Sequence, residues 1–266
     1  MYNLTVNILI KSVLFVLMTY GLHGVGEAAQ LSVKYERPES DKYLKIYQVL
    51  KANHKSMFGE SSKYLEGLYD WQVDIELVVT SCHYANSRYL PDTKKIFICY
   101  ESLYQKIYDY PKKANSKHAF ERRVMQNVMF TFWHEVGHAL IDQFRIGSGL
   151  NLEKLELLAD EFAALSMLWR RDNQWKDILM ISALHFKSKS ERNTDVPYKN
   201  HPSDELRYQK MIALLYGFAQ KSYARLRPET DQFEWLEISA HEYYLERSRF
   251  WEQNLRDHAR KGFFDN

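Results

Sequence analysis

Residues 134–138 read HEVGH, and they stand inside a long helical pattern that we place at Ala119–Phe144. His134 and His138 are four residues apart, so on a helix they lie on one face, one turn apart. Their ring nitrogens can then converge on one metal ion. Zinc accepts imidazole nitrogen and tolerates an open fourth position, and Glu135 can act beside it as a general base. Because so short a pattern also arises by chance, two ordinary His on an exposed helix face are the alternative.

The residues that follow predict a second helix, turned back against the first. Gly147-Ser148-Gly149 breaks the helical pattern, and Asn151 can cap a helix that runs to about Arg171. This helix carries the run ELLAD, in which Glu156 and Asp160 share one face. Glu156 can supply a third metal ligand, and Asp160 can accept the other ring N–H of a ligand His. A plain amphipathic helix with solvated acids is the alternative.

Two other acids of the second helix compete with Glu156 for the position of third ligand. Glu153 lies on roughly the same face but has no acid four residues later, and Glu161 points away, about 100° round the helix from Asp160. We therefore prefer Glu156. The longer zinc motif H-E-x-x-H-x-x-G-x-x-H is excluded, because Ile141 and Phe144 stand where its Gly and third His would be.

The part of the chain before the HEVGH helix predicts one helix and two strands. Residues 29–40 are expected to be a loose lead-in, and a helix is expected from Asp41 to about Gly59. Val73–Thr80 and Lys94–Tyr100 are rich in β-branched and aromatic residues and are predicted as strands. Asn86–Thr93, with its Asn, Pro and Asp, is predicted as the loop between them.

The rest of the chain is expected to be helical. Besides the two helices already described, we predict a short helix over 101–110, helices over 175–186 and 234–260, and a helix with Pro202 in its first turn that ends near Gly217. Residues 187–200 are polar and are predicted as a loop.

The first 28 residues have the character of a secretory signal peptide. Lys11 precedes an apolar stretch over Ser12–Leu22, and cleavage between Ala28 and Ala29 would place small residues at the required positions. We therefore expect an exported protein, periplasmic or secreted, with no stable membrane insertion after signal cleavage. An uncleaved membrane anchor is the alternative, which the shortness of the apolar stretch disfavours.

Cys82 and Cys99 are the only cysteines of the chain. An even number suits one disulfide in an oxidising compartment, and two buried free thiols are the alternative. Hydrophobic residues make up 45% and charged residues 26%, which is typical of a folded domain, and a net charge of +2 gives no sign of a nucleic-acid binder. We expect one domain over residues 29–266, of the α+β class and mostly helical, with a small disulfide-closed strand pair.

HEVGH followed by ELLAD resembles the gluzincin metallopeptidases, the thermolysin-like group in which an E-x-x-x-D helix follows H-E-x-x-H. More narrowly, the chain resembles a bacterial family of proposed metallopeptidases whose function is otherwise unknown. That resemblance spans roughly Cys82–Gly217. It rests on the runs HEVGHALID and ELLADEFAAL, on Cys82 with Asn86 and Tyr89, on Ile96–Tyr100 followed by Glu101, and on His201 with Glu205, Arg207 and Leu215–Gly217.

The chain departs from that family pattern in two places. Typical members carry a further Cys pair in the C-terminal half, where this chain has Ala213 and Ser239. They also place an acid just before the later His, where this chain has Asn200. The first departure bears on the packing of the last helices, and the second bears on any role carried over to His201.

The resemblance implies a zincin-like metallopeptidase domain that binds one zinc ion. His134, His138 and Glu156 would hold the zinc, and Asp160 would orient a ligand His. The metal-activated water would attack a peptide bond with Glu135 as general base, so the expected substrate is a peptide or protein.

Two further features of the site come from the same resemblance. His201 is the first candidate for the donor that stabilises the oxyanion, and the alternative is that it only leads into the helix at Pro202. In related folds the substrate pairs with an edge strand above the metal helix, and Lys94–Tyr100 is the edge that this sequence suggests.

Three hypotheses about function follow. The first is an exported zinc-dependent endopeptidase. The second is a catalytically inactive, zinc-stabilised binding protein with the same fold. The third is a metal-free interaction module held by its disulfide. Glu135 favours the first, because a purely structural zinc site has no need of a general base beside its ligands.

Overall fold

The computed structural model describes residues 29–109, 116–170, 172–192, 201–223 and 238–260, and the predicted signal peptide lies outside these ranges. As expected, the described chain is of the α+β class and mostly helical, with one sheet of four strands. Its longer helices are α2 (Leu44–Ala52), α3 (Glu60–Leu68), α4 (Tyr100–Asp109), α5 (Lys117–Gln143), α6 (Leu152–Leu168), α7 (Asn173–Glu191), α8 (Asp204–Phe218) and α9 (Ala240–Leu255).

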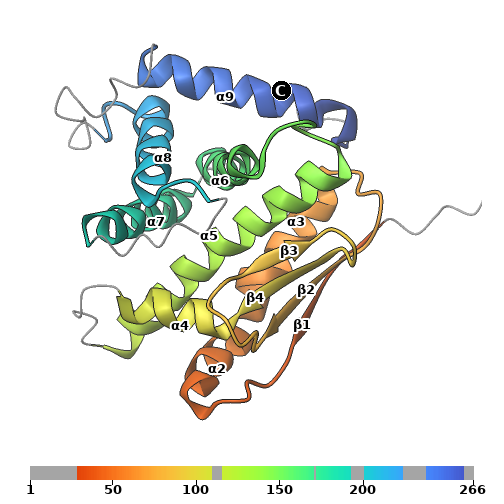
Figure 1. Cartoon of the computed structure of the whole chain (residues 1–266), viewed down its shortest axis with the longest axis vertical. Coiled ribbons are helices and arrows are strands. Elements are labelled where there is room, and N and C mark those ends of the chain that lie inside the picture. Colours follow the sequence, from red (N-terminus) through yellow and green to blue (C-terminus); the bar gives the residue numbers. More distant parts are fainter. Residues whose placement is uncertain (1–28, 110–115, 171, 193–200, 224–237, 261–266) are drawn as a thin grey trace, which may run out of the picture.

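Helix α5 runs through the middle of the molecule. The sheet and helices α2 to α4 lie on one side of it, and helices α6 to α9 lie on the other (Figure 1). Helix α5 contacts both α6 and the sheet. Among the described residues, every helix is too short or too polar to cross a lipid bilayer.

The sheet has the strand order β1-β2-β4-β3. Strands β1 (Leu31–Tyr35), β2 (Ile75–Thr80) and β4 (Lys95–Cys99) are parallel, and β3 (Arg88–Leu90) pairs antiparallel with β4. Strands β2 and β4 are the two strands that the sequence predicts, and their pairing is confirmed. They form the centre of the sheet because their β-branched side chains fill both of its faces.

Two expectations about the sheet are wrong. Residues 31–35 are not a loose lead-in but form β1, since alternate residues face inward: Leu31 is buried whereas Ser32 and Lys34 are exposed. Residues 88–90, expected within a loop, form β3 with Tyr89 buried. Strand β4 is therefore flanked on both sides, so Lys94–Tyr100 is an inner strand and β3 is the edge on its side of the sheet.

The predicted disulfide between Cys82 and Cys99 is present, with Cα atoms 5.5 Å apart. It joins the loop that follows β2 to the end of β4. The carboxylate of Glu101 accepts hydrogen bonds from the backbone N–H groups of Cys82 and His83, at 3.0 and 3.3 Å. The loop that leads to the edge strand is thus fixed to the start of α4 by a covalent bond and two hydrogen bonds.

The helix boundaries differ from the prediction mainly where local capping decides them. The prediction that the first helix ends near Gly59 is wrong, because a π-helical turn at Lys55–Gly59 follows α2 and leads directly into α3. Helix α7 continues to Glu191, supported by the ion pair of Lys187 with Glu191. Helix α8 begins after Ser203, whose side chain accepts the N–H of Leu206, so Pro202 precedes the helix.

The last helix also starts later than expected. Ser239 and Glu242 form a capping box at the start of α9, because each side chain bonds the backbone N–H of the other. The expected residues 234–237 lie outside the described chain.

The reversal between α5 and α6 depends on glycine. Gly147 and Gly149 have φ angles of +68° and +86°, which residues with a Cβ rarely adopt. After this turn, Asn151 caps α6 as predicted by accepting the N–H of Lys154 at 3.0 Å. The two helices then approach closely. A Cβ on Gly137 would lie 3.0 Å from Ala159 Cα and 3.1 Å from its carbonyl oxygen.

We predict that Gly137→Ala destabilises the protein by about 1–3 kcal/mol, because the added methyl group meets backbone atoms of α6 that cannot rotate away. Gly67→Ala in α3 is the matched control, since a Cβ there has no neighbour within 4 Å. It is expected to be neutral or stabilising by up to about 1 kcal/mol. Urea unfolding measures both. A Gly137→Ala protein as stable as wild type would contradict the close helix contact.

Candidate metal centre

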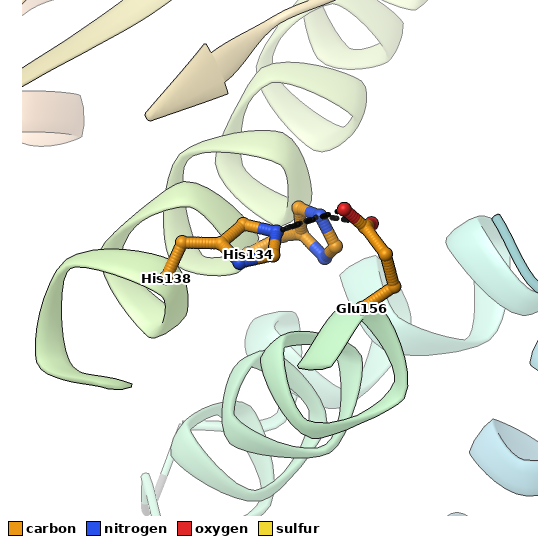
Figure 2. A group of neighbouring side chains, drawn as sticks. All are labelled: His134, His138 and Glu156. Carbon is orange, nitrogen blue, oxygen red and sulfur yellow. Dashed lines mark hydrogen bonds and ion pairs between the residues drawn. The ribbon is translucent and has the colours of Figure 1, made fainter. Parts of the chain in front are cut away.

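The structure brings three side chains together at the contact of α5 and α6. His134 and His138 extend from α5, and Glu156 extends from α6 (Figure 2). The two Nε2 atoms are 3.2 Å apart, His134 Nε2 is 3.4 Å from Glu156 Oε2, and His138 Nε2 is 3.4 Å from Glu156 Oε1. A tetrahedral zinc ion, with ligand distances of about 2.0–2.1 Å, requires its ligand atoms to lie about 3.3 Å apart. The three side chains therefore have the spacing of a tetrahedral site.

The chemistry of this donor set also fits a divalent cation. Two imidazoles and one carboxylate suit zinc, whereas calcium and magnesium favour oxygen ligands alone. Glu156 Oε2 is buried and makes no hydrogen bond of good geometry within the described chain. A buried carboxylate oxygen without a donor is costly, and a cation at the centre of the triangle would remove that cost.

Asp160 holds the His134 ring in position. Its Oδ1 atom lies 2.8 Å from His134 Nδ1, so Nδ1 donates its proton there and Nε2 faces the centre of the triangle. Arg207 Nε and Nη2 donate to the two oxygens of Asp160, each at 2.7 Å. Helices α5, α6 and α8 therefore meet at the carboxylate of Asp160.

The charges in this cluster strongly shift the pKa values of its side chains. Burial acts to raise the pKa of Asp160, but the positive charges of Arg207 and His134 outweigh burial and lower that pKa to about 2. Burial acts to lower the pKa of His134, but the Asp160 and Glu156 carboxylates outweigh it and raise that pKa to about 10. Burial also acts to raise the pKa of Glu156, but the nearby rings of His134, His138 and His201 outweigh burial and hold that pKa well below its usual range. The carboxylates of Asp160 and Glu156 thus favour a positive charge at the centre of this cluster.

Glu135 follows His134 directly in α5 and is buried. It is only 3% exposed, and within the described chain no protein group donates a hydrogen bond to it. Its neighbours Trp133 and Val136 are buried in the core, which fixes the backbone of α5 at this point. A buried carboxylate that no protein donor satisfies can accept a proton from a water molecule.

His201 lies at the same site, before the start of α8. Its Nδ1 atom is 3.3 Å from Glu156 Oε2, and 35% of its side chain is exposed. The rival acids are elsewhere: Glu153 is exposed on α6, and Glu161 is buried against α9, where Arg247 Nε donates to it at 2.8 Å. The structure thus places Glu156 alone, among the acids considered for the third ligand, next to both His rings.

Two contacts of α5 were not predicted. Asp142 Oδ2 accepts hydrogen bonds from Tyr89 Oη at 2.7 Å and from Lys94 Nζ at 2.6 Å, which fastens the edge strand β3 to the helix that carries the His pair. Lys106 Nζ on α4 donates to Thr131 Oγ1 at 2.6 Å. Both acceptors lie four residues from a site residue, Asp142 after His138 and Thr131 before Glu135. That spacing is the only signal the sequence offers for them.

We predict that Asp160→Asn weakens zinc binding by about 10- to 100-fold, since His134 loses the acceptor that orients its ring. It should also destabilise the metal-free protein by about 3 kcal/mol, because Arg207 keeps a mostly buried charge without a partner. Calorimetric zinc titration and urea unfolding measure the two effects. Glu153→Gln, an exposed acid of the same helix, is the control and should change neither. Unaltered zinc affinity in Asp160→Asn would contradict the proposed orientation of His134.

Comparison with known proteins gives one match. Residues 35–255 match the model of a family described as "Putative metallopeptidase". No similar curated protein and no similar solved structure was found. The matched residues include the whole His134, His138 and Glu156 cluster, and a peptidase of this kind implies a peptide or protein substrate. Since the match covers most of the chain, the chain belongs to this family of putative metallopeptidases.

Proposed function

We propose that this protein is an exported, zinc-dependent endopeptidase. The observation that carries the proposal is the triangle of His134, His138 and Glu156, together with the adjacent residue Glu135, whose buried carboxylate accepts no hydrogen bond within the described chain. The spacing and the donor types of the triangle suit one zinc ion. A site that only stabilised the fold would not need a buried carboxylate next to its ligands.

Each residue of the site has a distinct role in this proposal. When bound, the zinc ion lowers the pKa of a water that it binds and polarises the scissile carbonyl. Glu135 accepts the proton of the attacking water and then delivers it to the nitrogen of the leaving amine. His201 donates a hydrogen bond to the carbonyl oxygen as negative charge develops on it. Asp160 and Arg207 keep His134 in the orientation that the site requires.

The substrate would pair with the edge strand β3. Within the described chain β3 pairs only with β4, so its other edge offers backbone N–H and C=O groups to an extended peptide. Such pairing gives affinity with little dependence on side chains. Asp142 fixes the distance between β3 and α5 through Tyr89 and Lys94. A peptide on β3 would then lie over the face of α5 that carries the His pair.

Export is supported by two features of the chain. The apolar stretch over Ser12–Leu22 has the character of a signal peptide. The Cys82–Cys99 disulfide suits an oxidising compartment. The N-terminal residue of the protein isolated from its native cells checks this point, and Ala29 is the expected result.

We predict that Glu135→Gln keeps its zinc but hydrolyses peptides about 10²- to 10⁴-fold more slowly, because the amide cannot accept the proton. In the same assay, His201→Ala should keep its zinc and lose about 10²- to 10³-fold in kcat. Glu153→Gln is the control that should retain full activity. Hydrolysis by Glu135→Gln at the wild-type rate would refute this mechanism. A wild-type protein that binds zinc but cleaves no peptide would favour the inactive binding protein.

A further inference from the structure

Lys106 lies near the proposed reaction centre but has no role in the mechanism above. Its Nζ atom donates to Thr131 Oγ1 at 2.6 Å. Thr131 precedes Glu135 by four residues, so the two share one face of α5 and are separated by about 6 Å along the helix axis. The Lys106 ammonium is therefore placed about one helical turn from the general base, on the same side of the metal helix.

Arg207 and Lys189 form ion pairs with carboxylates, whereas Lys106 forms none within the described chain. Glu135 and Asp160 act on the charge of Lys106 only from a greater distance. Arg207 binds Asp160 with two hydrogen bonds. Lys189 Nζ lies 2.8 Å from Asp204 Oδ2. Within the described chain, no carboxylate lies within ion-pairing distance of Lys106 Nζ, and the neutral Thr131 hydroxyl is its hydrogen-bond partner. An ammonium ion so placed retains capacity to bind an anion.

Protein surrounds most of the Lys106 side chain. The residue keeps some solvent exposure. Even so, burial is the main cause that lowers its pKa to about 8, and the charge of Arg207 adds to the effect. The side chain is therefore largely enclosed by protein but not sealed from water. At neutral pH Lys106 is still mostly protonated, and solvent would screen its attraction to a bound anion only weakly.

We propose that Lys106 binds a carboxylate group of the peptide substrate, close to the scissile bond. This inference rests on the proposed function, because it assigns the substrate class of the same site. An extended peptide advances about 3.3–3.6 Å per residue, so a separation of about 6 Å corresponds to one or two residues. The carboxylate is either the free C-terminus of a short peptide or the side chain of an Asp or Glu.

Matched peptide pairs test the inference without requiring turnover. Zinc-loaded Glu135→Gln protein is titrated with a peptide that has neutral side chains and a free C-terminal carboxylate. The same peptide with a C-terminal carboxamide is its neutral twin. The protein is then titrated with carboxamide peptides that carry Glu or Gln at each position in turn. We expect at least one carboxylate peptide to bind about 10-fold more tightly than its neutral twin. The first pair identifies a C-terminal carboxylate, and the second series identifies an acidic side chain.

Substitutions then connect the preference to Lys106. Lys106→Gln in the same background should abolish the preference and leave the Kd of the neutral twins within about twofold, and Lys106→Arg should keep part of it. Lys63→Gln, an exposed lysine of α3, is the control. The inference is overturned if, with Lys106 present, the carboxylate peptide and the neutral peptide of every pair bind with equal Kd. This result requires no variant at position 106. It is also overturned if the preference persists in Lys106→Gln.

The two proposals fail in different ways. If the wild-type protein hydrolyses no peptide but still prefers carboxylates through Lys106, the peptidase assignment fails and the anion site stands. If the wild-type protein hydrolyses free-acid, amidated, acidic and neutral peptides with equal kcat/KM, the peptidase assignment stands and the role of Lys106 is refuted.

Discussion

The Asp160 carboxylate is buried among three helices, where it accepts two hydrogen bonds from Arg207 and one from His134. A carboxylate in such a position is stable only when its partners remain in place, because removing one partner leaves an uncompensated buried charge. This requirement fixes α8 against α6 and fixes the imidazole ring of His134 on α5. The orientation of the His134 ring, the first candidate metal ligand, is therefore a consequence of how the C-terminal helices pack. Arg207 acts on the site through Asp160, and its guanidinium also packs on the Phe186 ring at 4.1 Å.

A second constraint sets the distance between α5 and α6, the two helices that carry the candidate metal ligands. Gly137 allows the backbone of α5 to approach Ala159 on α6, and this approach brings the His134 and His138 rings to Glu156. On the opposite side, Asp142 ties the same helix to the edge strand β3. One face of α5 thus presents, in order, Thr131 with Lys106, then Glu135 and the His pair, and then Asp142. An extended peptide over this face would contact each of these groups in turn, which connects the packing of α5 to the proposed substrate.

The sequence predicts those parts of the site that depend on residues close together in the chain. The HEVGH and ELLAD runs place their side chains by helix periodicity alone, and Asn151 caps α6 through its own next residues. The short strands β1 and β3 were missed because three to five residues form a strand only when a neighbour pairs with them. Tyr89 and Asp142 are 53 residues apart, and Lys106 and Thr131 are 25 apart, so no local pattern links either pair. Helix α8 starts at Asp204, and Pro202 precedes the helix instead of lying in its first turn, because the side-chain cap of Ser203 decides the boundary.

The central claim is that His134, His138 and Glu156 together bind one zinc ion, and the zinc content of the purified protein tests it most directly. Wild type, Glu156→Ala and Glu153→Ala are dialysed against the same low zinc concentration and measured by elemental analysis. The account predicts about one zinc ion per chain in wild type and in Glu153→Ala, and much less in Glu156→Ala, which lacks the third ligand. No zinc in wild type after addition of the metal, or equal zinc in all three proteins, would contradict the three-residue site.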